Sequence, residues 1–130
     1  MRRPAIVLAV CAALVAGCGG DDGGGGGAKA RTETVPAGKA LHEVAREYSF
    51  NPKDVVVERA GTLRIVLDNK GSLAHNLKVL KDGKELGGTP TFQGGKPRTG
   101  SVRLQPGSYE MVCTVGNHEQ LGMKAKLTVK

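Results

Sequence analysis

The chain has 130 residues, an apolar fraction of 39% and a formal net charge of +7, which is enough for one domain with a modest core. Its 20 glycines and 6 prolines, with no tryptophan, are typical of a turn-rich β protein and argue against a helical bundle. The basic residues do not form blocks with interleaved aromatics, so we expect no binding to nucleic acid.

The first 34 residues predict export and tethering. Residues 1–17 begin with a basic pair, continue as a short apolar run and end in small residues before Cys18. This resembles a bacterial lipobox, so we expect a lipoprotein signal peptide over 1–17 and a lipid on Cys18; an ordinary secretory signal cleaved nearby is the alternative. Residues 18–34 are rich in glycine and predict a flexible tether. A globular domain is expected over 35–130, in the periplasm or on the outer face of the bacterial cytoplasmic membrane.

Export changes the cysteine count and the net charge. Cys11 would leave with the signal peptide and Cys18 would carry the lipid, so Cys113 would be a single thiol in an oxidising compartment. Metal ligation explains such an unpaired thiol. Loss of the two N-terminal arginines lowers the net charge from +7 to +5, which favours only a modest attraction to acidic proteins or anionic headgroups.

After the tether, apolar residues recur at every second position, which predicts half-buried β-strands. The segments with this pattern are 55–57, 63–67, 75–79, 102–104, 109–113 and 123–129. Residues 86–100 are rich in glycine, proline and threonine, and they indicate either a long loop or a pair of short edge strands. Several short strands without a convincing helical segment predict an all-β fold, an antiparallel sandwich or barrel.

Strand parity gives three polar or sulfur-bearing residues an inward position. Side chains alternate between the two faces of a strand, and His75, Cys113 and Met123 each fall in phase with the apolar residues of their own segment. All three lie at strand ends where the chain enters a loop. We therefore expect them to line one end of the sandwich, half buried.

The types of these side chains point to copper. Cys113, His118 and Met123 follow one another at equal spacing, with four residues between each pair. Soft sulfur ligands combined with imidazole suit copper, and a trigonal site of two histidines and one cysteine with a weak axial methionine serves single-electron transfer. His75, at the start of a predicted strand, is the best candidate for the second histidine. His42 is expected on the surface, with no role.

Other chemistries remain open from the residues alone. Cys113 and His118 could act as thiolate and base in a hydrolase, although no third orienting residue is evident, so we expect no enzyme. Zinc is compatible with two histidines and one cysteine, but methionine is a poor zinc ligand. A protein that carries copper without redox turnover is a further alternative, although the chain is not rich in methionine and histidine.

Residues 106–113, followed by His118 and Gly122-Met123, resemble the C-terminal loop of the cupredoxins, the small blue copper proteins. Residues 48–52 and 69–76 are also similar to that family, so the resemblance covers nearly all of 41–130. The ligand spacing resembles the rusticyanin and sulfocyanin branches more than the plastocyanins. The resemblance implies a Greek-key β-sandwich or barrel.

The resemblance also implies a cofactor and a function. One type I copper ion would be held by His75, Cys113 and His118, with Met123 as the axial ligand; Gln120, the kind of oxygen ligand that some relatives use, does not match in position. Asn76 would tie the two ligand loops together. The implied function is shuttling of single electrons, by a monomer, between redox partners such as cytochromes or oxidases that dock near His118 and Leu121.

Overall fold

The computed structural model describes residues 31–130. The predicted signal peptide, Cys18 and most of the predicted tether lie outside these residues. In the described part of the chain the secondary structure consists of ten β-strands: β1 (Thr32–Val35), β2 (Leu41–Arg46), β3 (Ser49–Asn51), β4 (Asp54–Val57), β5 (Gly61–Asn69), β6 (Lys78–Lys81), β7 (Lys84–Gly88), β8 (Arg98–Leu104), β9 (Gly107–Val112) and β10 (Lys124–Val129). Over the same residues, no helix is long and apolar enough to cross a membrane.

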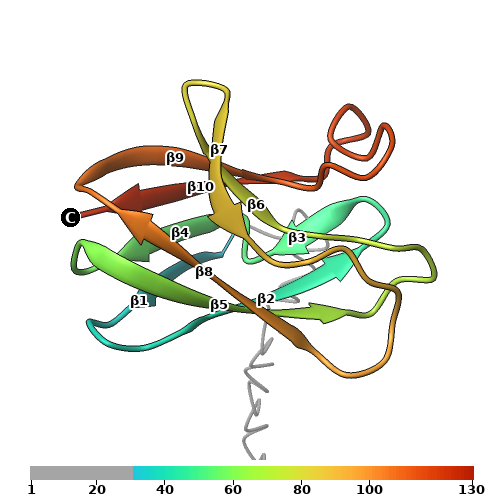
Figure 1. The fold of residues 1–130 in the computed structure, drawn as a ribbon, viewed down its shortest axis with the longest axis horizontal. Coiled ribbons are helices and arrows are strands. Elements are labelled where there is room, and N and C mark those ends of the chain that lie inside the picture. Colours follow the sequence, from blue (N-terminus) through green and yellow to red (C-terminus); the bar gives the residue numbers. More distant parts are fainter. Residues whose placement is uncertain (1–30) are drawn as a thin grey trace, which may run out of the picture.

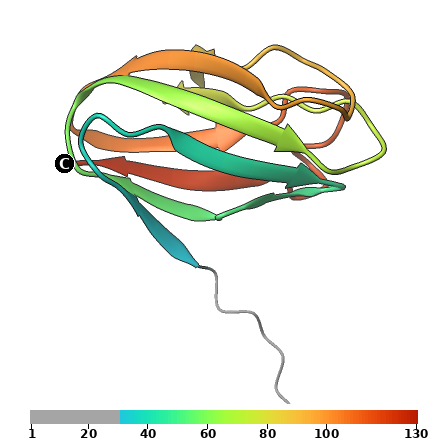
Figure 2. The same cartoon turned by 90° about the horizontal axis from the view of Figure 1, so that it is seen from below.

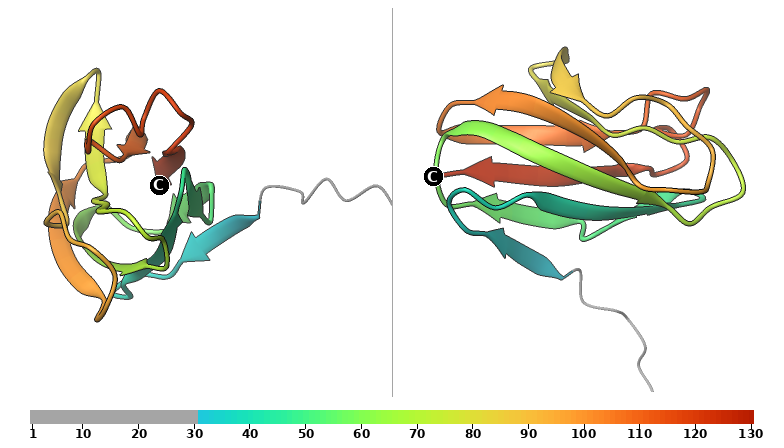
Figure 3. Two further views of the ribbon diagram at one scale, coloured as in Figure 1. Left: turned by 90° about the vertical axis from the view of Figure 1, so that its right-hand side faces the viewer. Right: turned by 60° about the horizontal axis from the view of Figure 1, so that its bottom comes forward.

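All ten strands join in one sheet, in the order β1-β4-β10-β9-β6-β7-β8-β5-β2-β3. The sheet curls around a central core (Figure 1; Figure 3, left). The all-β prediction is therefore confirmed. Most strand pairs are antiparallel, as predicted, but β1–β4, β4–β10 and β2–β5 are parallel. Alternation of apolar residues determines which face of a strand is buried, whereas it does not determine the partner or the direction of the pairing.

The described domain begins slightly earlier than predicted. The tether was expected to reach residue 34, whereas β1 pairs with β4 from Thr32 to Val35 and lies beside it at the edge of the sheet (Figure 2). Only Val35 of this strand is buried. Because β1 is added through backbone hydrogen bonds and buries one side chain, its sequence carries no alternation that would reveal a strand.

The core lies inside the curled sheet and is formed by the inward face of nearly every strand. Its buried apolar side chains are Val35, Leu41, Ala45, Phe50, Val55, Val57, Leu63, Ile65, Leu67, Leu77, Val79, Val102, Leu104, Tyr109, Met111, Cys113, Met123, Ala125, Leu127 and Val129. Two predicted site residues, Cys113 and Met123, belong to this cluster. The copper-site candidates therefore lie at the boundary between the core and the loops at one end of the molecule.

One inward-facing position of β2 is occupied by a glutamate. Glu43 lies between Leu41 and Ala45 in the alternation and is as buried as they are. Neither of its carboxyl oxygens has a hydrogen-bond partner. Burial, with a smaller contribution from the charge of Glu33, raises the pKa of the Glu43 carboxyl to about 9. Glu43 is therefore a neutral carboxylic acid inside the folded domain at neutral pH.

The segment 86–100 combines both predicted alternatives. It contains the end of β7 at Gly88, a loop over 89–97, and the start of β8 at Arg98. The two strands approach closely here, since a Cβ on Gly100 would collide with the carbonyl of Gly88. Gly100 is therefore required by the close approach of two backbones.

Candidate metal centre

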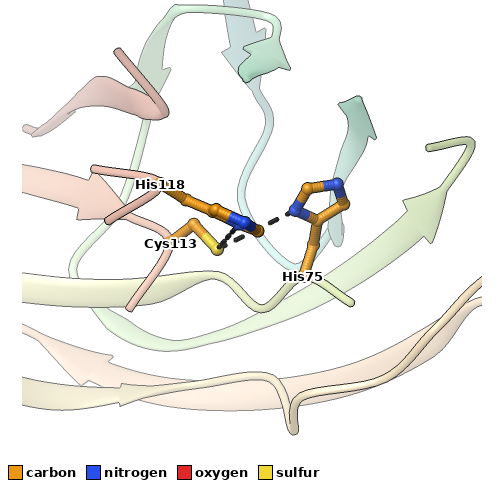
Figure 4. Close-up of side chains that lie close together, drawn as sticks. All are labelled: His75, Cys113 and His118. Carbon is orange, nitrogen blue, oxygen red and sulfur yellow. Dashed lines mark hydrogen bonds between the residues drawn. The ribbon is translucent and has the colours of Figure 1, made fainter. Parts of the chain in front are cut away.

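His75, Cys113 and His118 meet at one end of the barrel (Figure 4). The Cys113 Sγ atom is 3.5 Å from Nδ1 of His118 and 4.0 Å from Nδ1 of His75. The potential ligand atoms of the three residues all lie within 4.8 Å of one another. His75 and Cys113 are fully buried, and His118 is only 7% exposed. The site side chains are therefore more deeply buried than the half-burial that the sequence predicted.

This arrangement fits a transition metal ion. Donors at about 2.0 Å (nitrogen) and 2.3 Å (sulfur) from one ion, about 120° apart, would be about 3.7 Å from each other. The two measured sulfur-to-nitrogen separations, 3.5 and 4.0 Å, lie on either side of that value. A thiolate with two imidazoles is also the donor set that suits copper. The three residues therefore fit the ion that the sequence predicted.

His75 is held by a segment that the sequence did not identify. Its backbone N–H donates to the carbonyl of Phe92, and the N–H of Phe92 donates back to the carbonyl of His75, both at 3.0 Å. The side-chain amide of Asn69 donates to the carbonyls of Leu73 and Phe92 at 2.9 Å. His75 thus lies on an isolated bridge, and the strand that was predicted to start there begins at Lys78.

Asn76 connects three loops. Its carbonyl oxygen accepts a hydrogen bond from the backbone N–H of Thr114, and its amide donates to the hydroxyls of Thr114 and Thr91, each at 2.8 Å. Thr114 follows Cys113, Asn76 follows His75, and Thr91 belongs to the loop over 89–97. These contacts fix the relative position of two of the candidate ligands.

The segment from Cys113 to Met123 is closed by its own backbone. The N–H of Cys113 donates to the carbonyl of Met123 at 3.1 Å, and the N–H of Met123 donates to the carbonyl of His118 at 3.0 Å. Gly116 and Gly122 have positive φ angles of 49° and 107°, which glycine adopts readily. Met123 is fully buried and its axial role stays a prediction, whereas Gln120 is exposed.

A residue with no predicted role contacts the site. Glu47 lies in the turn between β2 and β3, and its carboxylate accepts hydrogen bonds from the backbone N–H of Leu73 at 2.7 Å and from Nε2 of His75 at 3.0 Å. The Leu73 contact, followed by those with Ser72 and His75, lowers the pKa of Glu47 to about 2, although partial desolvation opposes this. No local pattern marks this glutamate, because its partner lies 28 residues away.

Tyr48, the next residue of the same turn, lies beside the other imidazole. Its ring centroid is 5.0 Å from that of His118, and the His118 ring is in turn 5.0 Å from the His75 ring. By contrast, His42 is exposed on β2, which confirms its predicted surface position.

Comparisons with known proteins agree with this geometry. Residues 39–130 match the family described as copper binding proteins, plastocyanin/azurin family. No curated protein sequence matches. Among solved structures, a dithionite-reduced auracyanin from Roseiflexus castenholzii is 19% identical, with a TM-score of 0.62 over 78% of this chain and 99% of that chain.

Two further structures share the fold. Auracyanin A from Chloroflexus aurantiacus, described as a "blue" copper protein, is 19% identical, with a TM-score of 0.63 over 75% of this chain and 99% of that one. An azurin from Methylomonas sp. strain J is 14% identical, with a TM-score of 0.62 over 72% of this chain and 99% of that one.

The family match, which covers most of the chain, identifies the class of protein. The chain belongs to the copper-binding proteins of the plastocyanin/azurin family, and it has the all-β cupredoxin fold. The buried group of His75, Cys113 and His118 fits a type I copper ion as its cofactor.

Proposed function

We propose that this protein is an extracytoplasmic, membrane-tethered type I copper protein that shuttles single electrons between redox partners. The observation that carries the proposal is the buried group of one sulfur and two imidazole nitrogens within 4.8 Å of one another, in a chain of a copper-binding family. His75, Cys113 and His118 would hold the ion, and Met123 would be its axial ligand. Bound copper supplies a one-electron couple between cuprous and cupric states.

The residues around the site would limit rearrangement on electron transfer. Cuprous and cupric ions prefer different geometries, so a site that changes little between them lowers the cost of each turnover. The bridge to Phe92 holds His75, and the hydrogen bonds between Asn76 and Thr114 attach the two ligand loops to one another. Rigid attachment of this kind supports rapid, reversible electron transfer.

The apolar surface near His118 supports the proposal that a redox protein docks there. Four large apolar side chains are exposed in the described residues: Tyr48 at 37%, Leu73 at 42%, Leu86 at 41% and Leu121 at 49%. Three of them adjoin the site, because Tyr48 lies against the His118 ring, Leu73 donates to Glu47, and the Leu121 N–H donates to the His118 carbonyl. We propose that a cytochrome or an oxidase docks here, close to His118 and Leu121.

The tether rests on the sequence alone. The apolar start of the chain and Cys18 support export and lipid attachment. Fractionation of cells that express the full chain tests this: Cys18→Ser should move the protein from the membrane to the soluble fraction. Retention of the variant on the membrane would contradict lipid anchoring through Cys18.

Absorption and voltammetry of the copper-loaded protein test the central proposal. We expect an intense blue colour in the oxidised protein, its loss in Cys113→Ser, and its retention in the control His42→Gln, which removes a histidine outside the site. Voltammetry should show a reversible one-electron wave. A colourless loaded protein would contradict a type I site, and release of copper on reduction would favour a carrier without electron-transfer turnover.

A further inference from the structure

We infer that Glu47 is a positioning residue for His75: its carboxylate fixes which imidazole nitrogen faces the metal and strengthens that nitrogen as a donor. The inference rests on the proposed copper site. The two nitrogens of His75 point to different partners, since Nδ1 lies 4.0 Å from Cys113 Sγ and Nε2 lies 3.0 Å from Glu47 Oε1. A carboxylate only accepts hydrogen bonds, so Nε2 must carry the proton and Nδ1 is left free for a metal.

The Glu47 carboxylate is itself held in place. The backbone N–H of Leu73 donates to the same oxygen, Oε1, at 2.7 Å. Gly71 makes room for the carboxylate, because a Cβ at that position would collide with both Glu47 oxygens. A hydrogen bond from the Gly71 N–H to the side-chain oxygen of Asn69, at 3.0 Å, holds Gly71 in place. The loop that carries His75 therefore holds, through the N–H of Leu73, the glutamate that contacts His75.

The charge of Glu47 should act on the metal through the ring. A carboxylate that accepts from a ligating histidine makes the imidazole more basic and orients it. A more basic imidazole favours the cupric state, which prefers nitrogen donors, over the cuprous state. Glu47 should therefore increase cupric affinity and lower the reduction potential of the site.

The β2–β3 turn thereby serves both imidazoles. Glu47 contacts His75, whereas Tyr48, the next residue, lies 5.0 Å from the ring of His118. Of these two residues only Glu47 makes a hydrogen bond to an imidazole, so their effects can be separated experimentally.

The experiment compares wild type with Glu47→Gln, which keeps the shape but removes the charge, and with Glu47→Ala, which removes the acceptor. The control is Glu119→Gln, because this residue neighbours His118 and its carboxylate makes no hydrogen bond within the described part of the chain. Cupric affinity is measured by chelator competition and the potential by voltammetry. The proton position on His75 is measured in the copper-free protein by long-range proton–nitrogen NMR at alkaline pH.

We expect cupric affinity to fall about 10- to 100-fold in Glu47→Ala, less in Glu47→Gln, and little in Glu119→Gln. If cuprous affinity falls tenfold less than cupric affinity, the potential rises by about 59 mV. Copper-free wild type should show the proton on Nε2 of His75, and Glu47→Ala should show a mixture of both tautomers.

Three results would overturn the inference: equal potentials in wild type and Glu47→Gln, an equal shift in Glu119→Gln, or an unchanged His75 tautomer in Glu47→Ala. If Glu47→Ala does not fold, the isosteric Glu47→Gln alone decides through its potential. A wild-type protein that shows no blue copper site would instead contradict the proposed function, while the copper-free NMR measurement would still test the hydrogen bond.

Discussion

Replacing Glu43 by glutamine should stabilise the domain, increasingly so as the pH rises. The folded chain keeps the Glu43 proton up to about pH 9, whereas an unfolded chain releases it near the ordinary glutamate pKa of 4.5. Between these two values the folded state binds one more proton than the unfolded state, so the free energy of unfolding falls with rising pH by about 1.4 kcal/mol per unit.

From pH 4.5 to pH 7 the free energy of unfolding therefore falls by about 3 kcal/mol. This is a large share of the roughly 5 to 15 kcal/mol that stabilises a typical domain. Glutamine has nearly the same shape and no proton to lose. The difference in unfolding free energy between Glu43→Gln and wild type should therefore be small near pH 4.5 and reach about 3 kcal/mol at pH 7.

Urea unfolding of the copper-free proteins at pH 5, 6, 7 and 8 measures this difference. The matched control is Glu110→Gln on the exposed face of β9, which should change stability by less than about 0.5 kcal/mol at every pH. A difference between Glu43→Gln and wild type that stays constant from pH 5 to pH 8 would refute the reasoning, because it would show that the Glu43 carboxyl is solvated or paired in the folded state.

Two further predictions concern the copper site. Met123→Gln should lower the reduction potential measured by voltammetry, because an oxygen donor favours cupric copper more than a thioether does; an unchanged potential would count against Met123 as the axial ligand. Leu121→Asp should slow electron self-exchange measured by NMR line broadening at least tenfold without changing the blue absorption, because it places a charge in the proposed docking surface. Equal slowing by Leu86→Asp, on the remote strand β7, would show that the surface near His118 has no special role.

The parts of the candidate site that depend on short segments could be predicted from the sequence. Cys113, His118 and Met123 are defined by residue type and spacing within eleven residues, and period-two alternation placed Cys113 and Met123 inward, where both are fully buried. The family resemblance supplied the Greek-key fold, which agrees with the family match. Local pattern was sufficient for the three side chains because their type, spacing and inward position require no knowledge of strand partners.

The remaining features depend on contacts between distant segments. Phe92 forms a bridge with His75, Glu47 accepts a hydrogen bond from the same residue, and β2 pairs in parallel with β5. None of these partners is specified by alternation or by turn residues. Glu43 illustrates the limit most clearly, because its inward position follows from the pattern of β2 while its burial without a partner contradicts the usual behaviour of glutamate.

The closed backbone of the segment from Cys113 to Met123 affects how the protein acquires its metal. The ends of the segment are joined through the paired residues Val112 and Lys124, so the sheet already bears the entropic cost of closing the loop. Binding of an ion then has little chain to order, in contrast to small metal domains that fold only when loaded. Copper would therefore enter a largely preformed site, and most of its binding free energy would be available for affinity and for discrimination between oxidation states.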